Sequence, residues 1–194
     1  FFVIATQNPV ESDGTFELPE AQLDRFLVKS TIGYPDREGE RTLLLRRLER
    51  ASATPTVDQV IESDVAANLQ TAQEGVSVDE DLVEYITDVA RETRSHPDVD
   101  TGVSPRGTQR LLEMARAAAV YDGRDFVVPD DVKRVAKPTL AHRLILTTEA
   151  RIETVAPRSV VADVLDSVAV PRDADAVSNE PENDESRLLS GYWL

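Results

Sequence analysis

Two short apolar runs near the start of the chain have the pattern of buried strands. The first, 1–5, is apolar without alternation, which is typical of a strand covered on both faces of a parallel sheet. The second covers 26–32, and a polar loop and a short helical segment around 18–21 separate the two. We therefore expect residues 1–33 to fold as strand, loop, short helix and strand.

After residue 33 the apolar positions recur with the spacing of amphipathic helices. We predict helices at 37–51, 62–73, 79–94, 104–121 and 129–137, extended pieces at 144–147 and 151–155, and a last helix around 159–167. Asp36 and Ser104 are suitable N-caps, and Pro105 suits the first position of a helix. The pattern thus predicts an α/β segment followed by an all-α region.

From residue 172 onward the chain is polar and acidic, and we expect this tail to be disordered because it holds too little apolar surface to offset the entropy of ordering. Its acidic residues are Asp173, Asp175, Glu180, Glu182, Asp184 and Glu185. The apolar end of the tail, 188–194, is the exception and can dock on the helical region or on a partner.

The composition excludes several kinds of site and partner. A net charge of −15 argues against nucleic-acid binding, which needs a basic face. Cysteine is absent, so the chain has no disulfide, thiolate nucleophile or cysteine metal site. The two histidines, His96 and His142, are far apart in the sequence and predict no metal cluster. No apolar run approaches the length of a membrane span, so we expect no membrane insertion.

The acidity has two interpretations. The only lysines are Lys29, Lys133 and Lys137. An acidic surface so poor in lysine suits a protein that works in high salt, where screening weakens the repulsion between carboxylates. An ordinary acidic protein is the alternative, and the composition leaves both open.

Polar residues follow the first predicted strand at the point where open α/β sheets bind ligands. Thr6, Gln7 and Asn8 lie at the carboxyl end of that strand. The neutral amide of Asn8 can orient a water or a phosphate oxygen without adding charge, as phosphoryl transfer requires. The alternative is that Asn8 and Pro9 only end the strand and begin a turn.

Arg106 lies in the first turn of the helix predicted at 104–121, where a cation is unfavourable because the helix N-terminus carries partial positive charge. A bound anion would explain the residue, since helix N-termini bind phosphates. The alternative is a solvated arginine with a small electrostatic penalty, and the residues alone favour neither.

Several short sequences together resemble the MoxR family of AAA+ ATPases, and the resemblance covers residues 1 to about 171. They are Ala-Thr-Gln-Asn-Pro at 5–9, Gly-Thr-Phe at 14–16, Leu-Pro-Glu-Ala-Gln-Leu-Asp-Arg-Phe at 18–26, Gly-Tyr-Pro at 33–35 and Gly-Val-Ser-Pro-Arg-Gly at 102–107. The resemblance implies that Asn8 is the sensor 1 residue and that Arg25 is the arginine finger that reaches the neighbouring subunit's nucleotide. It also implies that Arg106 is the sensor 2 residue, which contacts the γ-phosphate in its own subunit.

The resemblance also implies an organisation and a function. Residues 1–34 would be the end of a P-loop AAA+ core with parallel strands, 35–171 a helical lid domain, and 172–194 the disordered acidic tail. The whole protein would bind ATP and Mg²⁺ between the subunits of a ring, expected to be a hexamer. It would couple hydrolysis to chaperone-like remodelling or maturation of client proteins, often beside proteins with von Willebrand factor A domains. We expect it to be cytoplasmic.

The chain contains neither a G-x-x-x-x-G-K-[ST] loop nor a credible Walker B acid. Residues 126–131 imitate a Walker B strand, but Pro129 would interrupt it. Both elements are expected upstream of Phe1, together with most of the ATP and Mg²⁺ contacts, so we expect a C-terminal fragment that hydrolyses no ATP alone. The alternative is a non-enzymatic helical adaptor. A magnesium-chelatase-like subunit is a third possibility, which the sequence Leu-Pro-Glu-Ala-Gln at 18–22 disfavours.

Arg25 and His142 also have structural interpretations. Arg25 can pair with a nearby acid such as Asp24 or Glu20, a surface interaction worth at most about 1 kcal/mol. His142 is expected to be a packing or hydrogen-bonding residue at a helix end, because no second metal ligand lies near it in the sequence.

If the acidity is a salt adaptation, the free energy of unfolding should rise between about 0.1 M and about 1 M salt, because the Debye length falls from roughly 10 to roughly 3 Å. Urea titrations at increasing salt concentrations measure this dependence. A free energy of unfolding that stays flat or falls would leave only the ordinary acidic protein.

Overall fold

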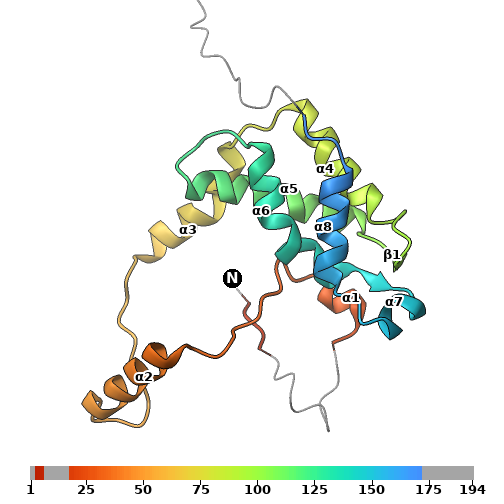
Figure 1. The fold of residues 1–194 in the computed structure, drawn as a ribbon. Helices are drawn as coiled ribbons and strands as arrows, with labels where there is room; N and C mark the ends of the chain where they lie inside the picture. The colour runs from red at the N-terminus through yellow and green to blue at the C-terminus, as the bar shows by residue number, and fades with distance from the viewer. Residues whose placement is uncertain (1–2, 7–17, 172–194) are drawn as a thin grey trace, which may run out of the picture.

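The chain is mainly helical in the computed structural model, which describes residues 3–6 and 18–171 (Figure 1). The elements in chain order are α1 (Glu20–Leu23), α2 (Arg37–Glu49), α3 (Ser63–Thr71), the 3₁₀ helix η1 (Ala72–Gly75), α4 (Glu80–Glu92), β1 (Val99–Thr101), α5 (Pro105–Tyr121), α6 (Pro129–Leu140), the 3₁₀ helix η2 (Ala141–Arg143), β2 (Ile145–Leu146), α7 (Thr148–Ile152) and α8 (Pro157–Ser167). Within the described ranges, none of these helices combines the length and the apolar content needed to cross a bilayer.

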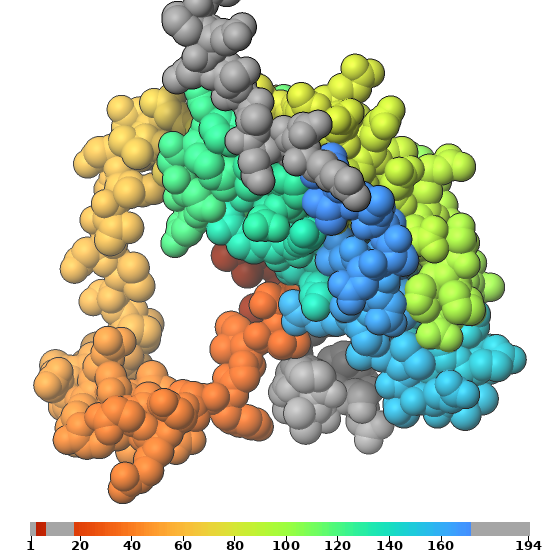
Figure 2. All heavy atoms as spheres, turned by 45° about the horizontal axis from the view of Figure 1, so that its top comes forward, coloured from red at the N-terminus to blue at the C-terminus, as the bar shows by residue number. Residues whose placement is uncertain are grey.

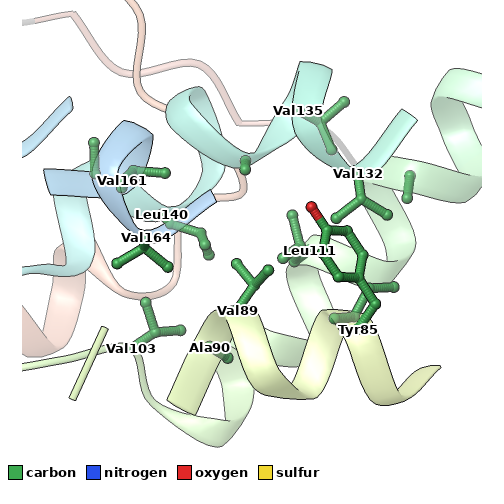
Figure 3. Close-up of a cluster of buried hydrophobic side chains, with 14 of the residues drawn as sticks. Tyr85, Val89, Ala90, Val103, Leu111, Val132, Val135, Leu140, Val161 and Val164 are labelled. Atoms are coloured by element: carbon green, nitrogen blue, oxygen red, sulfur yellow. The ribbon is translucent and has the colours of Figure 1, made fainter. Parts of the chain in front are cut away.

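The core lies between α4, α5, α6 and α8, whose apolar side chains point toward one another (Figure 3). The largest apolar side chains that are fully buried are Leu82, Val89, Val103, Leu111, Val132, Leu140, Val160, Val161 and Val164. Beside this core β1 and β2 pair antiparallel, with Val99 opposite Leu146. The apolar faces predicted for the helices at 79–94 and 104–121 are thus buried, except at Val83, which was predicted on the apolar face of the first and is 45% exposed.

The predicted helix boundaries agree with the structure where a capping residue sets them. The Asp36 carboxylate accepts a hydrogen bond from the Gly39 amide at 2.8 Å, and Ser104 Oγ accepts one from the Gly107 amide at 3.2 Å. Gly123, with φ of +73°, follows the end of α5. These signals are local, which is why the sequence reveals them.

As predicted, residues 126–131 do not form a Walker B strand. Pro129 begins α6, and Asp131 in its first turn is 2% exposed. The Asp131 carboxylate accepts a hydrogen bond from the Val128 amide at 3.0 Å and pairs with Arg124 at 2.7 Å. Asp131 therefore caps its own helix and is not directed at a metal ion.

The strands predicted at 1–5 and 26–32 do not form in the described part of these ranges. The apolar side chains of these segments are exposed, with Ile4 at 79% and Ile32 at 100%. A strand needs a neighbour to satisfy its backbone groups, and the described residues provide no parallel partner for either segment. The missing partner, rather than the local sequence, leaves them without strand structure.

The extended piece predicted at 151–155 is a second difference, because α7 covers Thr148–Ile152 instead. Thr147 accepts a hydrogen bond from the Ala150 amide at 3.2 Å and so caps this short helix. Helix α7 is short and ends at Ile152, three residues before Val155. The spacing of these two apolar residues therefore resembles that of an extended segment.

Helix α2 stands apart from the rest of the described chain and is joined to it by extended segments on both sides (Figures 1 and 2). None of its residues is buried, and Leu44 and Leu48 are 67% and 81% exposed. The predicted helix is present, but its leucine stripe contacts no core within the described residues.

Leu82→Ala should lower the free energy of unfolding by about 2–5 kcal/mol, because it empties a fully buried site on α4. Val83, the next residue, is 45% exposed, and Val83→Ala should change that free energy by less than about 1 kcal/mol. Denaturant titrations of both variants measure the difference, and equal losses would contradict the assignment of the buried face.

Candidate functional site

The structure places two of the three predicted site residues at exposed positions. Arg25 lies in the turn that follows α1, and Arg106 is the second residue of α5. Neither guanidinium forms an ion pair with another residue of 3–6 or 18–171. Asn8 lies outside the described residues, so its position stays a prediction.

The backbone of the Arg25 turn is tightly folded. The amide of Asp24 donates to the Glu20 carbonyl at 2.9 Å, and the Arg25 amide donates to the Gln22 carbonyl at 3.1 Å. The Asp24 carboxylate does not pair with Arg25. It accepts hydrogen bonds from Arg143 Nε at 3.1 Å and from Ser104 Oγ at 3.2 Å. Asp24 thus connects α1 to the helical region and leaves Arg25 exposed.

The start of α5, which carries Arg106, is fixed to the end of α4. Val103, the residue before the N-cap, donates its amide proton to Thr93 Oγ1 at 3.0 Å and accepts from Arg94 Nε at 2.9 Å. Gly102 lies so close to α4 that a Cβ there would be 2.8 Å from the Arg94 backbone nitrogen. The first turn of α5 therefore has a defined position before any ligand binds.

The hydrogen bond between Ser104 and Asp24 brings the two arginines into one region. Arg25 is the neighbour of Asp24, and Arg106 is two residues after Ser104. Since consecutive Cα atoms are about 3.8 Å apart, this contact places the two arginine Cα atoms within about 20 Å of each other. Guanidiniums and helix N-termini are both groups that bind phosphate, and this contact limits how far apart they lie here.

Arg143 is the buried centre of this region, with a side chain that is 1% exposed. Beside its bond to Asp24 Oδ1, it donates to the carbonyls of Asp24 at 3.2 Å, Phe26 at 2.6 Å and Leu27 at 3.4 Å, and to that of Thr139. Burial lowers the pKa of Arg143, and the Asp24 carboxylate opposes that effect. An arginine stays protonated nonetheless, so a positive charge is enclosed here.

His142 borders the same guanidinium. Its Nε2 lies 2.9 Å from Nη1 of Arg143 and 3.2 Å from the Phe26 carbonyl oxygen. Burial lowers its pKa most, the charges of Arg143 and Lys29 lower it further, and the Phe26 carbonyl acts in the opposite direction. His142 is thus a packing and hydrogen-bonding residue, as the sequence predicts.

Comparison with known proteins identifies the family. Residues 91–164 match the AAA lid domain, and residues 1–28 match the ATPase family associated with various cellular activities. The chain is 37% identical to the chaperone MoxR1 of Mycobacterium tuberculosis, over 89% of this chain and 47% of that protein. The chain belongs to the MoxR family of AAA+ ATPases.

Other relatives agree with this MoxR assignment. The protein YeaC of Bacillus subtilis is 42% identical over 91% of this chain and 55% of its own length. A crystal structure of a candidate ATPase from Cytophaga hutchinsonii superposes with a TM-score of 0.76 and 32% identity, over 86% of this chain and 53% of that one. The chain spans about half the length of these relatives. The helical region around α5 is thus an AAA lid, as expected.

Sequence reasoning missed the residues that connect the two arginines of this MoxR-family chain. Asp24 was considered only as a candidate partner of Arg25, and Arg143 was not singled out. The available signal was an arginine within the mostly apolar segment 140–146. An arginine that is buried with such a segment requires an acidic or carbonyl partner elsewhere. No residue spacing identifies that partner.

Within the described ranges no group of histidine and carboxylate side chains has the arrangement of a metal site.

His142→Gln should weaken the dependence of stability on pH. The folded chain holds the pKa of His142 below its ordinary value of 6.5, so the unfolded chain binds more protons between these two pKa values. The stabilisation is complete above about pH 6.5 and is lost as the pH falls below it. Denaturant titrations between about pH 7.5 and 5 measure the effect. His96→Gln, which keeps His142, is the control; an unchanged pH dependence in His142→Gln would contradict the prediction.

Proposed function

We propose that this chain contains the phosphate-sensing part of an ATPase, in a whole protein that hydrolyses ATP between the subunits of a ring. The observation that carries the proposal is the hydrogen bond between Ser104 and Asp24, which groups the exposed Arg25 and Arg106. An isolated arginine would be an ordinary surface residue, whereas Arg106 in the first turn of α5, with Arg25 held within about 20 Å, can share an anion with it.

The donor set fits ATP, which the family binds. A guanidinium makes bidentate, charge-assisted hydrogen bonds to phosphate oxygens, and Arg106 adds this capacity to the first turn of the 17-residue helix α5. ATP with Mg²⁺ supplies the phosphoryl group that is transferred to water. We propose that residues outside this chain hold most of the nucleotide and the Mg²⁺.

The roles follow from where charge develops during hydrolysis. Asn8 would orient the attacking water, and Arg25 would neutralise negative charge on the neighbouring subunit's nucleotide. The family resemblance assigns Arg106 to the nucleotide of its own subunit. Because Ser104 contacts Asp24, we also consider an arrangement in which Arg106 and Arg25 face the same nucleotide.

The organisation of the whole protein is also part of the proposal. Residues 1–34 would complete an α/β core, whose other strands would cover the exposed Ile4 and Ile32. Residues 35–171 would be the lid, followed by the acidic tail. The ring would be a cytoplasmic hexamer that remodels or matures client proteins, including partners with von Willebrand factor A domains. The name of the chaperone MoxR1 supports a chaperone-like role.

In the whole protein, Arg25→Ala should reduce ATP turnover by about 10³-fold while ATP affinity stays near normal, because an arginine finger acts on the transition state. Steady-state turnover and equilibrium binding of a fluorescent ATP analogue measure the two quantities. Arg46→Ala is the control, since Arg46 is an exposed arginine of α2, the helix that stands apart from the rest of the described chain. Normal turnover in Arg25→Ala would show that Arg25 is an ordinary surface arginine, whereas absence of turnover in the unmodified whole protein would favour the non-enzymatic adaptor.

Mixed rings test which nucleotide each arginine serves. A partner variant with a disabled nucleotide-binding loop keeps its own Arg25 and Arg106. Rings that mix it with Arg25→Ala should regain activity that neither variant has alone. Recovery with Arg106→Ala would assign Arg106 to the neighbouring nucleotide, and no recovery would assign it to its own. Absence of recovery with Arg25→Ala, in rings shown to be mixed, would contradict action across the interface.

A further inference from the structure

The acceptors of Arg143 lie on both sides of Arg25. Before Arg25, the guanidinium contacts the carboxylate and the carbonyl of Asp24; after it, the guanidinium contacts the carbonyls of Phe26 and Leu27. Arg25 itself makes none of these contacts, and its side chain stays exposed. The lid arginine therefore holds the backbone around Arg25 and leaves its guanidinium available.

These carbonyls need a donor that the local structure does not supply. Helix α1 has only four residues, and the chain after it enters neither a helix nor a strand until α2. Buried carbonyl groups without a partner are costly, and a guanidinium offers several N–H donors in a fixed planar fork. Lysine has the same charge but lacks this fork, so it cannot replace the whole set of contacts.

Arg143 is fixed from the lid side as well. It donates to the Thr139 carbonyl, one helical turn before it in the chain. Its side chain also crosses the first turn of α5 at Gly107, where a Cβ would lie 2.9 Å from Arg143 Cδ. Gly107 is the neighbour of Arg106. Arg143 is therefore packed against the turn that carries one candidate phosphate ligand and hydrogen-bonded to the turn that carries the other.

We propose that Arg143 is a positioning residue for Arg25: it sets the orientation of the 24–27 turn relative to the lid, so that Arg25 reaches the neighbouring subunit's nucleotide. The inference rests on the proposed function of Arg25. A catalytic group that is misplaced by about 1 Å can lose about 10²-fold in rate, so the orientation of this turn relative to the lid matters even though the turn is folded by its own hydrogen bonds.

Arg143→Lys in the whole protein should lower kcat by about 10- to 100-fold with KM changed less than about twofold. It keeps the positive charge near Asp24 and loses the fork. The double variant Arg25→Ala/Arg143→Lys should be no slower than Arg25→Ala alone, because residues that act through one another are not additive. In mixed rings, Arg143→Lys should regain activity with the nucleotide-loop variant, as Arg25→Ala does.

Arg124→Lys is the matched control. Arg124 forms another guanidinium–carboxylate pair of the lid, with the buried Asp131 at 2.7 Å, and its hydrogen-bond partners within the described residues all lie between 122 and 131. The Arg124→Lys variant should lower thermal stability without a selective loss of kcat. Asp24→Asn, which retains the shape of the side chain, is a second test if Arg143→Lys folds poorly, with a smaller loss of kcat expected.

The outcomes separate the two proposals. If Arg25→Ala leaves kcat unchanged, the proposed function of Arg25 fails, and the positioning role fails with it. If Arg25→Ala is slow but Arg143→Lys retains normal kcat, only the positioning role is overturned. The same holds if Arg143→Lys lowers the kcat of the Arg25→Ala protein by as much as it lowers that of the unmodified protein. A loss in Arg143→Lys that mixed rings do not restore would likewise show a general structural defect.

Discussion

The enclosed charge of Arg143 is the constraint on which the arrangement of this chain depends. A guanidinium out of water is unfavourable unless anions and carbonyls surround it, and breaking such a buried pair costs about 3–5 kcal/mol. Here the chain supplies a carboxylate from Asp24 and carbonyls from the 24–27 turn and Thr139. Residues 24–27 are therefore held against the lid by polar contacts, although described apolar residues on either side of them, Ile4 and Ile32, stay exposed.

The same cluster explains what could be predicted from the sequence. Helices α4, α5 and α6 follow from apolar spacing and from caps such as Ser104, because these signals act within one or two turns. The hydrogen bond of Arg143 to Asp24 joins residues 119 positions apart, and no local rule selects that pair. The predicted strands failed for a related reason, since a strand is defined by a partner that the described residues do not contain.

For the candidate site, the sequence identified the arginines but not what holds them. Asp24 is adjacent to Arg25 and is an obvious ion-pair partner on paper. Neighbouring side chains do not face each other at the end of a helix, and Asp24 turns to the lid instead. Arg106 stood out because a cation in a first helical turn is electrostatically unfavourable, but only the family resemblance assigned it to a phosphate. Its grouping with Arg25 became visible only through the Ser104 contact.

A lid bound to the arginine turn has a consequence for how nucleotide state could be transmitted. Ser104 and Gly107 belong to the first turn of α5, and both contact the Asp24–Arg143 pair. A rotation of α5 that accompanied loss of a phosphate contact at Arg106 would then move the Arg25 turn as well. In the proposed ring, that turn would face another subunit, so a change at one interface would alter the lid and the finger together. The polar cluster thus provides a physical connection between the two arginines that does not require a continuous apolar core.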